Sequence, residues 1–119
     1  DVGTLQRLPR IVGDGMLREL AYTGRQFGAE EARSIGLVNR VYPDHESLLA
    51  GVFEIAHQIA AKSPIAVTGT KAMISYMRDH TVNDGLEYVA TWNAAMLQSN
   101  DLRVAIAAHM SKQKPEFVD

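Results

Sequence analysis

Three glutamates stand out as carboxylates that could serve as general acids or bases. Glu30 and Glu31 are adjacent, and Glu46 follows a proline–aspartate turn. Each lies where a helix is expected to begin, and a carboxylate there stabilises the positive end of the helix dipole. Asp1 is, by position alone, a frayed terminal side chain. Residue type and spacing therefore mark none of these carboxylates as catalytic.

Two lysines near the end of the sequence, Lys112 and Lys114, could bind a phosphate group. They follow the last expected helix, where cations also stabilise the negative end of the helix dipole. Gly13 and Gly15 match the start of a dinucleotide-binding fingerprint, but the third glycine and the preceding strand are missing. A turn leading into a helix accounts for both glycines.

The histidines and the lack of cysteine argue against metal chemistry. A chain without cysteine has no disulfides, thiolate nucleophiles or thiolate zinc sites. The four histidines, His45, His57, His80 and His109, are scattered and form no ligand pair at helical spacing. We therefore expect no metal site.

The composition is that of an ordinary globular protein. The 119 residues suit one domain or a substantial part of a larger one. A net charge of −2 argues against a dedicated nucleic-acid-binding protein, and no apolar run approaches the ~20 residues that span a bilayer. We expect neither nucleic acid nor membrane as partner. Because no Met and no signal peptide precede Asp1, we expect a processed or truncated chain, cytoplasmic if bacterial.

Turn-forming residues divide the first part of the chain into short helices. A helical turn over residues 4–8 should stop at Pro9. Asp14 is expected to cap a helix that ends at Gly24. A further helix over residues 29–35 should stop at Gly36, because glycine followed by an apolar residue is a helix-stop signal. Residues 37–42 are then the single candidate strand.

The rest of the chain is expected to be helical. Apolar residues from Leu48 to Ile59 recur at helical spacing. Ser63–Pro64 suits the start of a second helix that ends near residues 79–80. Two further helices should begin near residues 82 and 101, and Trp92 is expected to pack rather than stack on a ligand. These wide apolar faces either form a bundle or cover a surface that this chain does not contain.

Several segments together resemble the crotonase superfamily of enoyl-CoA hydratases and isomerases. These segments are residues 1–13, residues 20–25, residues 29–32, residues 36–39 with residues 41–43, Ser63–Pro64 with Lys71, and residues 112–115 with Phe117. The resemblance implies the C-terminal helical part of an α/β fold built as a spiral of ββα units. Residues 1–43 would end the spiral core, and residues 44–119 would form a helical region that covers the pocket and makes trimer contacts.

Within that superfamily, residues 1–9, 76–80, 88–93 and 96–98 resemble the dienoyl-CoA isomerases. The resemblance implies that Asp1 acts with an upstream glutamate as the distal acid or base of diene isomerisation in β-oxidation. Carboxylates can perform this proton transfer with no cofactor. An acyl-CoA substrate and a homotrimer or hexamer are implied too. Lys112 matches a lysine that contacts coenzyme A, but His109 stands where phenylalanine is usual.

The resemblance also implies that an N-terminal half is needed for activity, and that the apolar helix faces pack against that half and neighbouring subunits. Two alternatives stay open. The whole protein could be an enoyl-CoA hydratase of the same superfamily, in which Asp1 is a loop residue. The chain could instead be a non-catalytic oligomerisation fragment.

Overall fold

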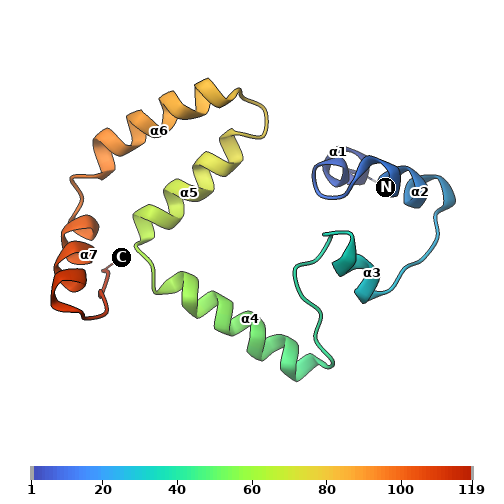
Figure 1. Cartoon of the computed structure of the whole chain (residues 1–119), viewed down its shortest axis with the longest axis horizontal. Coiled ribbons are helices and arrows are strands. Elements are labelled where there is room, and N and C mark those ends of the chain that lie inside the picture. The colour runs from blue at the N-terminus through green and yellow to red at the C-terminus, as the bar shows by residue number, and fades with distance from the viewer. Residues whose placement is uncertain (1, 119) are drawn as a thin grey trace. The chain divides into compact units, whose positions relative to one another are not determined.

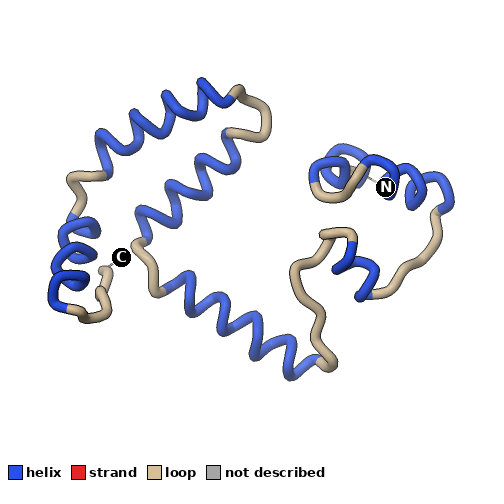
Figure 2. The backbone as a smooth tube through the Cα atoms, viewed as in Figure 1, coloured by secondary structure: helices blue, strands red, loops and turns tan. Residues whose placement is uncertain are grey.

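The computed structural model describes residues 2–118 as helices joined by loops (Figure 1). The elements are α1 (Thr4–Arg7), the 3-10 turn η1 (Leu8–Arg10), α2 (Asp14–Thr23), α3 (Ala29–Ser34), α4 (His45–Ala60), α5 (Pro64–Tyr76), α6 (Val82–Met96) and α7 (Asn100–Ser111). Figure 2 shows no strand among the described residues, which confirms the mainly helical prediction.

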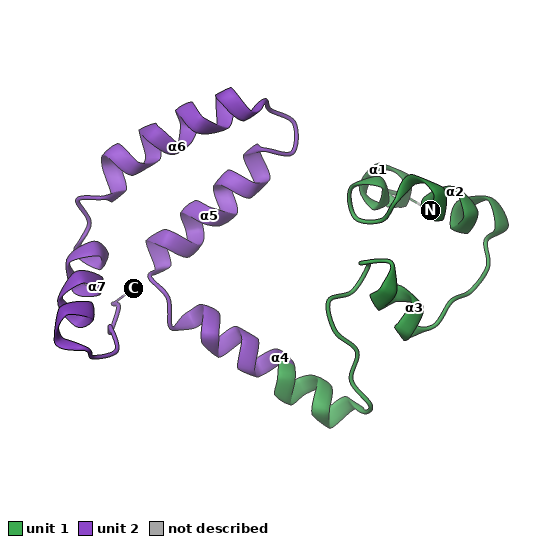
Figure 3. Cartoon of the chain, in the orientation of Figure 1, with its two compact units in different colours: residues 1–51 green, residues 52–119 purple. Residues whose placement is uncertain are grey.

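The chain divides into two compact units, residues 1–51 and residues 52–119, with the boundary inside α4 (Figure 3). The division between a core end and a covering region after residue 43 concerns functional roles, and it stays a prediction. None of the helices within residues 2–118 has both the length and the apolar composition that crossing a membrane requires.

Gly36 ends α3 as predicted. Its φ of 79° is left-handed. Its N–H donates to the Arg33 carbonyl at 3.1 Å, and the Leu37 N–H donates to the Ala32 carbonyl at 2.9 Å. This pair of hydrogen bonds is the Schellman motif, which glycine favours because it has no Cβ to clash.

Hydroxyl side chains begin the helices of the second unit. The Ser63 hydroxyl accepts a hydrogen bond from the Ala66 N–H at 3.2 Å, as predicted for the start of α5. Thr81 and Asp84 form a reciprocal capping box at the start of α6. The Ser99 hydroxyl caps α7 by accepting from the Leu102 N–H. Each hydroxyl satisfies a donor that the first turn of a helix leaves unpaired.

Some local predictions are wrong in detail. Helix α1 ends at Arg7, one residue before the predicted end, and Pro9 lies in the following turn η1, where an early helical position needs no N–H. The N-cap of α2 is Gly13 rather than Asp14, whose carboxylate instead pairs with Arg18 at 2.7 Å. Residues 37–42 form a loop, because a strand needs a neighbouring strand and the described residues contain none.

Helices α5 and α6 pack against each other as an antiparallel hairpin (Figure 1). The contact depends on glycine, because a Cβ at Gly69 would lie 2.6 Å from Nε1 of Trp92. Gly85 leaves room for Met77 in a similar way. Trp92 therefore packs against α5, as the sequence predicts.

The turn between α5 and α6 is closed by His80. Helix α5 ends at Tyr76, before the predicted end near residues 79–80. His80 Nδ1 lies 2.8 Å from the Tyr76 carbonyl oxygen and 2.7 Å from the Asp79 carboxylate. The imidazole also stacks on the Tyr76 ring, with centroids 3.6 Å apart. His80 thus adds a side-chain hydrogen bond at the helix end, where the Asp79 N–H also donates to the Tyr76 carbonyl at 3.5 Å.

Few apolar side chains are buried. The buried apolar residues are Val12, Leu17, Leu20, Ala32 and Ala108. In the second unit, Phe53 of α4 is 58% exposed, Ile74 of α5 is 65% exposed and Leu86 of α6 is 61% exposed. Helices with such faces need a further apolar surface. Of the two sequence-based alternatives, this favours helices that cover a surface outside the second unit over a closed bundle within it.

Candidate functional site

An open hollow of about 750 Å³ lies within the first unit. It is formed by α1, η1 and α2, with the loops that follow α2 and α3. Its apolar lining consists of Val2, Leu5, Leu8, Ile11, Leu17, Leu20, Ala21, Phe27 and Leu37. Its charged lining residues are Arg7 and Arg25. Mostly apolar walls with a few polar groups are typical of a small-molecule site of this size.

Buried residues of α2 and a tight turn support one side of this hollow. Leu17 and Leu20 are 9% and 8% exposed, and Val12 is 5% exposed. The N–H groups of Ile11 and Val12 both donate to the Leu8 carbonyl, at 2.9 and 3.1 Å. The turn from η1 into α2 is therefore fixed by backbone hydrogen bonds as well as by apolar packing.

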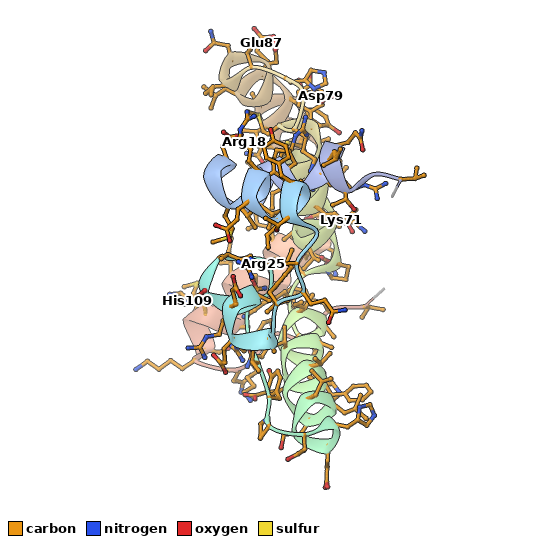
Figure 4. The ribbon with its side chains drawn as sticks, turned by 90° about the vertical axis from the view of Figure 1, so that its right-hand side faces the viewer. Arg18, Arg25, Lys71, Asp79, Glu87 and His109 are labelled. Atoms are coloured by element: carbon orange, nitrogen blue, oxygen red, sulfur yellow. The ribbon has the colours of Figure 1, made fainter. Side chains whose placement is uncertain are left out.

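Arg25 joins the end of α2 to the start of α3, and it is labelled in Figure 4. Its Nε donates to the Glu19 carboxylate at 2.9 Å, and its Nη1 donates to Glu31 at 3.0 Å, while Nη2 also contacts Glu31. The guanidinium holds the pKa of Glu31 below its usual range, chiefly through these hydrogen bonds. Hydrogen bonding to both carboxylates raises the pKa of Arg25. These hydrogen bonds of Arg25 hold in place the loop between α2 and α3, which carries Phe27.

Arg7 lies over Gly3 in the same hollow. A Cβ at Gly3 would be 2.9 Å from Nη1 of the exposed Arg7 side chain, so a larger residue there would displace the guanidinium. Gly3 also has a φ of 104°, which other residues avoid. Among residues 2–118, no carboxylate forms an ion pair with Arg7.

The carboxylates considered in the sequence analysis differ in their surroundings. Asp1, to which the resemblance assigns the distal acid or base, lies outside the described residues. Glu30 and Glu46 are exposed in the first turns of α3 and α4, as the dipole argument predicts. Glu31 differs, because its half-buried carboxylate pairs with Arg25 rather than facing solvent alone.

Lys112 closes α7 in a left-handed conformation with a φ of 55°, the single non-glycine case between residues 2 and 118. Its N–H donates to the His109 carbonyl at 3.2 Å, and the Gln113 N–H donates to Ala108 at 2.9 Å, which completes a Schellman motif. The side chains of Lys112, Lys114 and His109 are exposed. The structure thus leaves these side chains accessible to a ligand or a partner.

The remaining sequence candidates do not gather into a site. Within residues 2–118, no group of three or more His, Asp or Glu side chains is arranged as a metal-ion ligand set. Gly13 is the extended N-cap of α2, and Gly15 lies in the first turn of that helix. Both glycines therefore serve the turn into α2.

Sequence reasoning missed the Arg25 network and the contact of Arg7 with Gly3. No helical spacing relates Arg25 to Glu31, because a loop separates them. The available signal was opposite charge on the two sides of a short connection. For Gly3, the signal was a glycine directly before a helical turn, four residues from an arginine.

The described residues therefore form a helical fold. Its first unit has an open apolar hollow of small-molecule size, and the helices of its second unit expose apolar faces. The sequence comparison gives the family. The chain belongs to the enoyl-CoA hydratase/isomerase family, whose model matches residues 1–119.

Two curated relatives are dienoyl-CoA isomerases. The chain is 53% identical over 117 residues to the peroxisomal Delta(3,5)-Delta(2,4)-dienoyl-CoA isomerase of Arabidopsis thaliana, in an alignment that covers 98% of this chain and 42% of that protein. It is 46% identical to the mitochondrial enzyme of Rattus norvegicus, where the alignment covers 99% of this chain and 36% of that protein. The chain therefore spans well under half the length of these relatives.

The fold is shared with solved structures. The crystal structure of an enoyl-CoA hydratase from Bacillus anthracis matches 97% of this chain and 44% of its own, with a TM-score of 0.90 and 36% identity. The similarity confirms a crotonase-type helical part.

Proposed function

We propose that this chain is the C-terminal, mainly helical part of a dienoyl-CoA isomerase of fatty-acid β-oxidation. The observation that carries the proposal is the identity of 53% and 46% to two dienoyl-CoA isomerases, compared with 36% to the hydratase structure. Residues 1–43 would end the spiral core, and residues 44–119 would cover the pocket and form subunit contacts. Activity would need the N-terminal half that this chain does not include.

The reaction moves a 3,5-diene of an acyl-CoA thioester to the 2,4 position. A base removes a proton from the carbon next to the thioester, and the electrons shift so that the thioester oxygen gains negative charge. A second group then returns a proton at the far end of the diene. Carboxyl groups can perform both proton transfers, while backbone N–H donors stabilise the charged oxygen.

Asp1 is the group proposed for the far end of the diene. An upstream glutamate would act next to the thioester, and the main donors to its oxygen would lie upstream too. The apolar hollow supports this assignment, because Val2 and Leu5 follow Asp1 closely in the chain and line the hollow. The tail of an acyl chain requires such walls, so a carboxyl group beside them would meet the far end of the substrate.

The variant Asp1→Asn in the full-length protein tests this role. We expect diene isomerisation to fall about 10²- to 10⁴-fold, the usual contribution of a positioned acid or base. Acyl-CoA affinity should change little, because asparagine has nearly the same size. Asp14→Asn, which alters an exposed carboxylate paired with Arg18, is the matched control. Full activity of Asp1→Asn would remove the proposed mechanism.

A hydratase of the same superfamily is the second candidate, and the TM-score of 0.90 to a hydratase structure favours it. The full-length protein should be offered a 2-enoyl-CoA and a 3,5-dienoyl-CoA in parallel. Hydration of the first without turnover of the second would replace the isomerase proposal.

A non-catalytic oligomerisation fragment is the third candidate, favoured by the exposed apolar faces of α4 and α6. The residues before Asp1 separate this candidate from an enzyme. A glutamate there, in a short glycine-containing loop, would favour the enzyme.

A homotrimer or hexamer that binds acyl-CoA belongs to the same proposal. Ile106 and Met110 of α7 are 50% and 81% exposed, which supports a subunit contact for this helix. We propose that Lys112 contacts coenzyme A, and we assign no ligand contact to His109.

A further inference from the structure

An open groove of about 790 Å³ lies between the second half of α4 and α5, inside the second unit. Its apolar lining includes Ile59 and Ile74, which are 51% and 65% exposed. No acidic residue lines the groove, and its charged lining residues are Lys62, Lys71 and Arg78. None of these three cations forms an ion pair among residues 2–118. The groove thus combines exposed apolar surface with positive charge that no described carboxylate balances.

Charge is segregated along the part of the chain that forms these helices. Residues 55–78 contain two lysines, one arginine and no Asp or Glu. Residues 79–102 contain four acidic residues and no Lys or Arg. This acidic stretch includes the whole of α6. The groove and α6 are therefore opposite in charge.

Helix α6 has an apolar face that its hairpin with α5 leaves open. Trp92 packs against α5, whereas Val82 and Leu86, one helical turn apart, are 67% and 61% exposed. Glu87, labelled in Figure 4, follows Leu86 and is exposed. Its carboxylate forms no ion pair among residues 2–118. This exposed face of α6 matches the groove in both apolar character and charge.

Helix α6 does not fill the groove of its own chain, because α5 separates the two (Figure 1). On α5, Val67, Lys71 and Ile74 line the groove and recur at helical spacing. Gly69, which lies against Trp92 of α6, is two residues from Val67 and thus about half a turn away. The groove and α6 lie on opposite sides of α5, so a second copy of the chain is the partner that presents the complementary face.

We propose that the groove between α4 and α5 binds the exposed face of α6 from a second copy of this chain. Val82 and Leu86 of one copy contact the apolar lining of the other, and Glu87 faces its cations. The two surfaces differ, so the contact is head-to-tail, and contacts of this kind can close into a ring. The inference rests on the proposed homo-oligomer, and it names the two surfaces that meet.

Charge reversal in the full-length protein tests the inference. Lys71→Glu and Glu87→Lys should each raise the dissociation constant of the oligomer about tenfold or more, because each places like charges in the contact. The double variant has opposite charges again and should return to within about threefold of the unaltered protein. Glu87 is the acidic residue chosen, because hydrogen bonds within the chain already engage the carboxylates of Asp79, Asp84 and Asp101.

Arg40→Glu is the matched control for these reversals. Arg40 is an exposed cation of the first unit and lines no part of the groove. Its reversal should leave the dissociation constant unchanged. Analytical ultracentrifugation over a dilution series measures this constant for all four variants.

The outcomes separate the inference from the function on which it rests. A double variant that assembles as weakly as the single variants overturns the inference. So does a Lys71→Glu variant that lowers the melting temperature or raises the KM for acyl-CoA while assembly is unchanged, since the groove would then bind another part of the protein or the ligand. Hydration of a 2-enoyl-CoA without diene isomerisation ends the isomerase proposal and leaves this contact in place.

Neutral substitutions decide if the reversed variants do not fold, as circular dichroism would show. Lys71→Gln and Glu87→Gln should each weaken assembly, and the variant with both changes should be little weaker than either one. Losses that simply add in the double variant would show that the two residues do not interact.

Discussion

At the scale of single residues, Gly69 allows α5 to approach α6 because glycine has a hydrogen atom where other residues have a Cβ. A Cβ there would lie 2.6 Å from Nε1 of Trp92. Gly69→Ala gains up to about 1 kcal/mol of helix propensity, but it displaces the indole. We expect a net loss of about 1–3 kcal/mol in the free energy of unfolding, measured by urea denaturation of the full-length protein.

Gly15→Ala is the control for that prediction. Gly15 lies in α2, and a Cβ added there would meet no atom within 4 Å beyond the backbone of its own helix. The same substitution should therefore raise the free energy of unfolding by about 0.5–1 kcal/mol. If Gly69→Ala stabilised the protein as Gly15→Ala does, the close approach of Trp92 to α5 would be disproved.

Substitution can distinguish the role of the Lys112 backbone conformation from the role of its side-chain charge. Glycine adopts the left-handed conformation of this position more readily than lysine. Lys112→Gly should thus preserve the thermal stability of the full-length protein, while the KM for acyl-CoA rises about tenfold through loss of a charge-assisted contact. Lys114→Gln serves as a neighbouring control with a smaller effect. An unchanged KM in Lys112→Gly would exclude the proposed contact with coenzyme A.

Residues whose role is set by their chain neighbours were predictable from the sequence. Gly36 and Ser63 act on backbone groups within a few positions, so local patterns identify them. The pairing of Arg25 with Glu31 was not predictable, because it depends on how the loop between α2 and α3 returns. Asp1 could be assigned a role only through the family resemblance, since neither its type nor its spacing indicates catalysis.

At the scale of helical elements, the turn between α5 and α6 should respond to pH. The pKa of His80 is raised, mainly by its hydrogen bond to the Tyr76 carbonyl, and Asp79 and Asp84 act in the same direction. A folded-state pKa above the unfolded value means that the protonated imidazole stabilises the fold. This stabilisation is complete below the ordinary pKa of 6.5 and is lost as the pH rises through the folded-state pKa.

Thermal unfolding of the full-length protein across this pH range measures the effect. His80→Gln should remove the loss of melting temperature that accompanies rising pH, because glutamine does not titrate. His57→Gln, on the exposed surface of α4, should leave that loss in place. An identical pH dependence in His80→Gln and the unaltered protein would show that His80 does not stabilise the turn.

The extents of the helices were largely predictable, because apolar residues recur at the helical period. The end of α5 was misplaced by several residues, since the His80 ring, rather than a glycine, closes the helix. Residues 37–42 have a strand-like sequence but form a loop here. Strand pairing depends on a neighbouring segment, and periodicity within a single segment cannot supply one.

At the scale of the whole molecule, the sequence left open whether the helices form a closed bundle. The exposure of Phe53, Ile74 and Leu86 shows that their apolar faces lack cover within the second unit. The chain spans 42% and 36% of the two dienoyl-CoA isomerases to which it is similar. Folding stability of such helices comes mainly from tertiary packing, so we expect these faces to pack against further apolar surface.

The exposed apolar faces lead to a prediction about assembly. The full-length protein should form a trimer or hexamer that binds little of the dye ANS, because its apolar faces are covered. Residues 1–119 produced alone should bind ANS strongly and associate non-specifically, since large exposed apolar patches promote both. Light scattering and ANS fluorescence of the two samples at equal molar concentration measure the difference. A monodisperse, ANS-silent monomer of residues 1–119 would show that the helices cover their own apolar faces, and the need for an N-terminal half would then lose its physical basis.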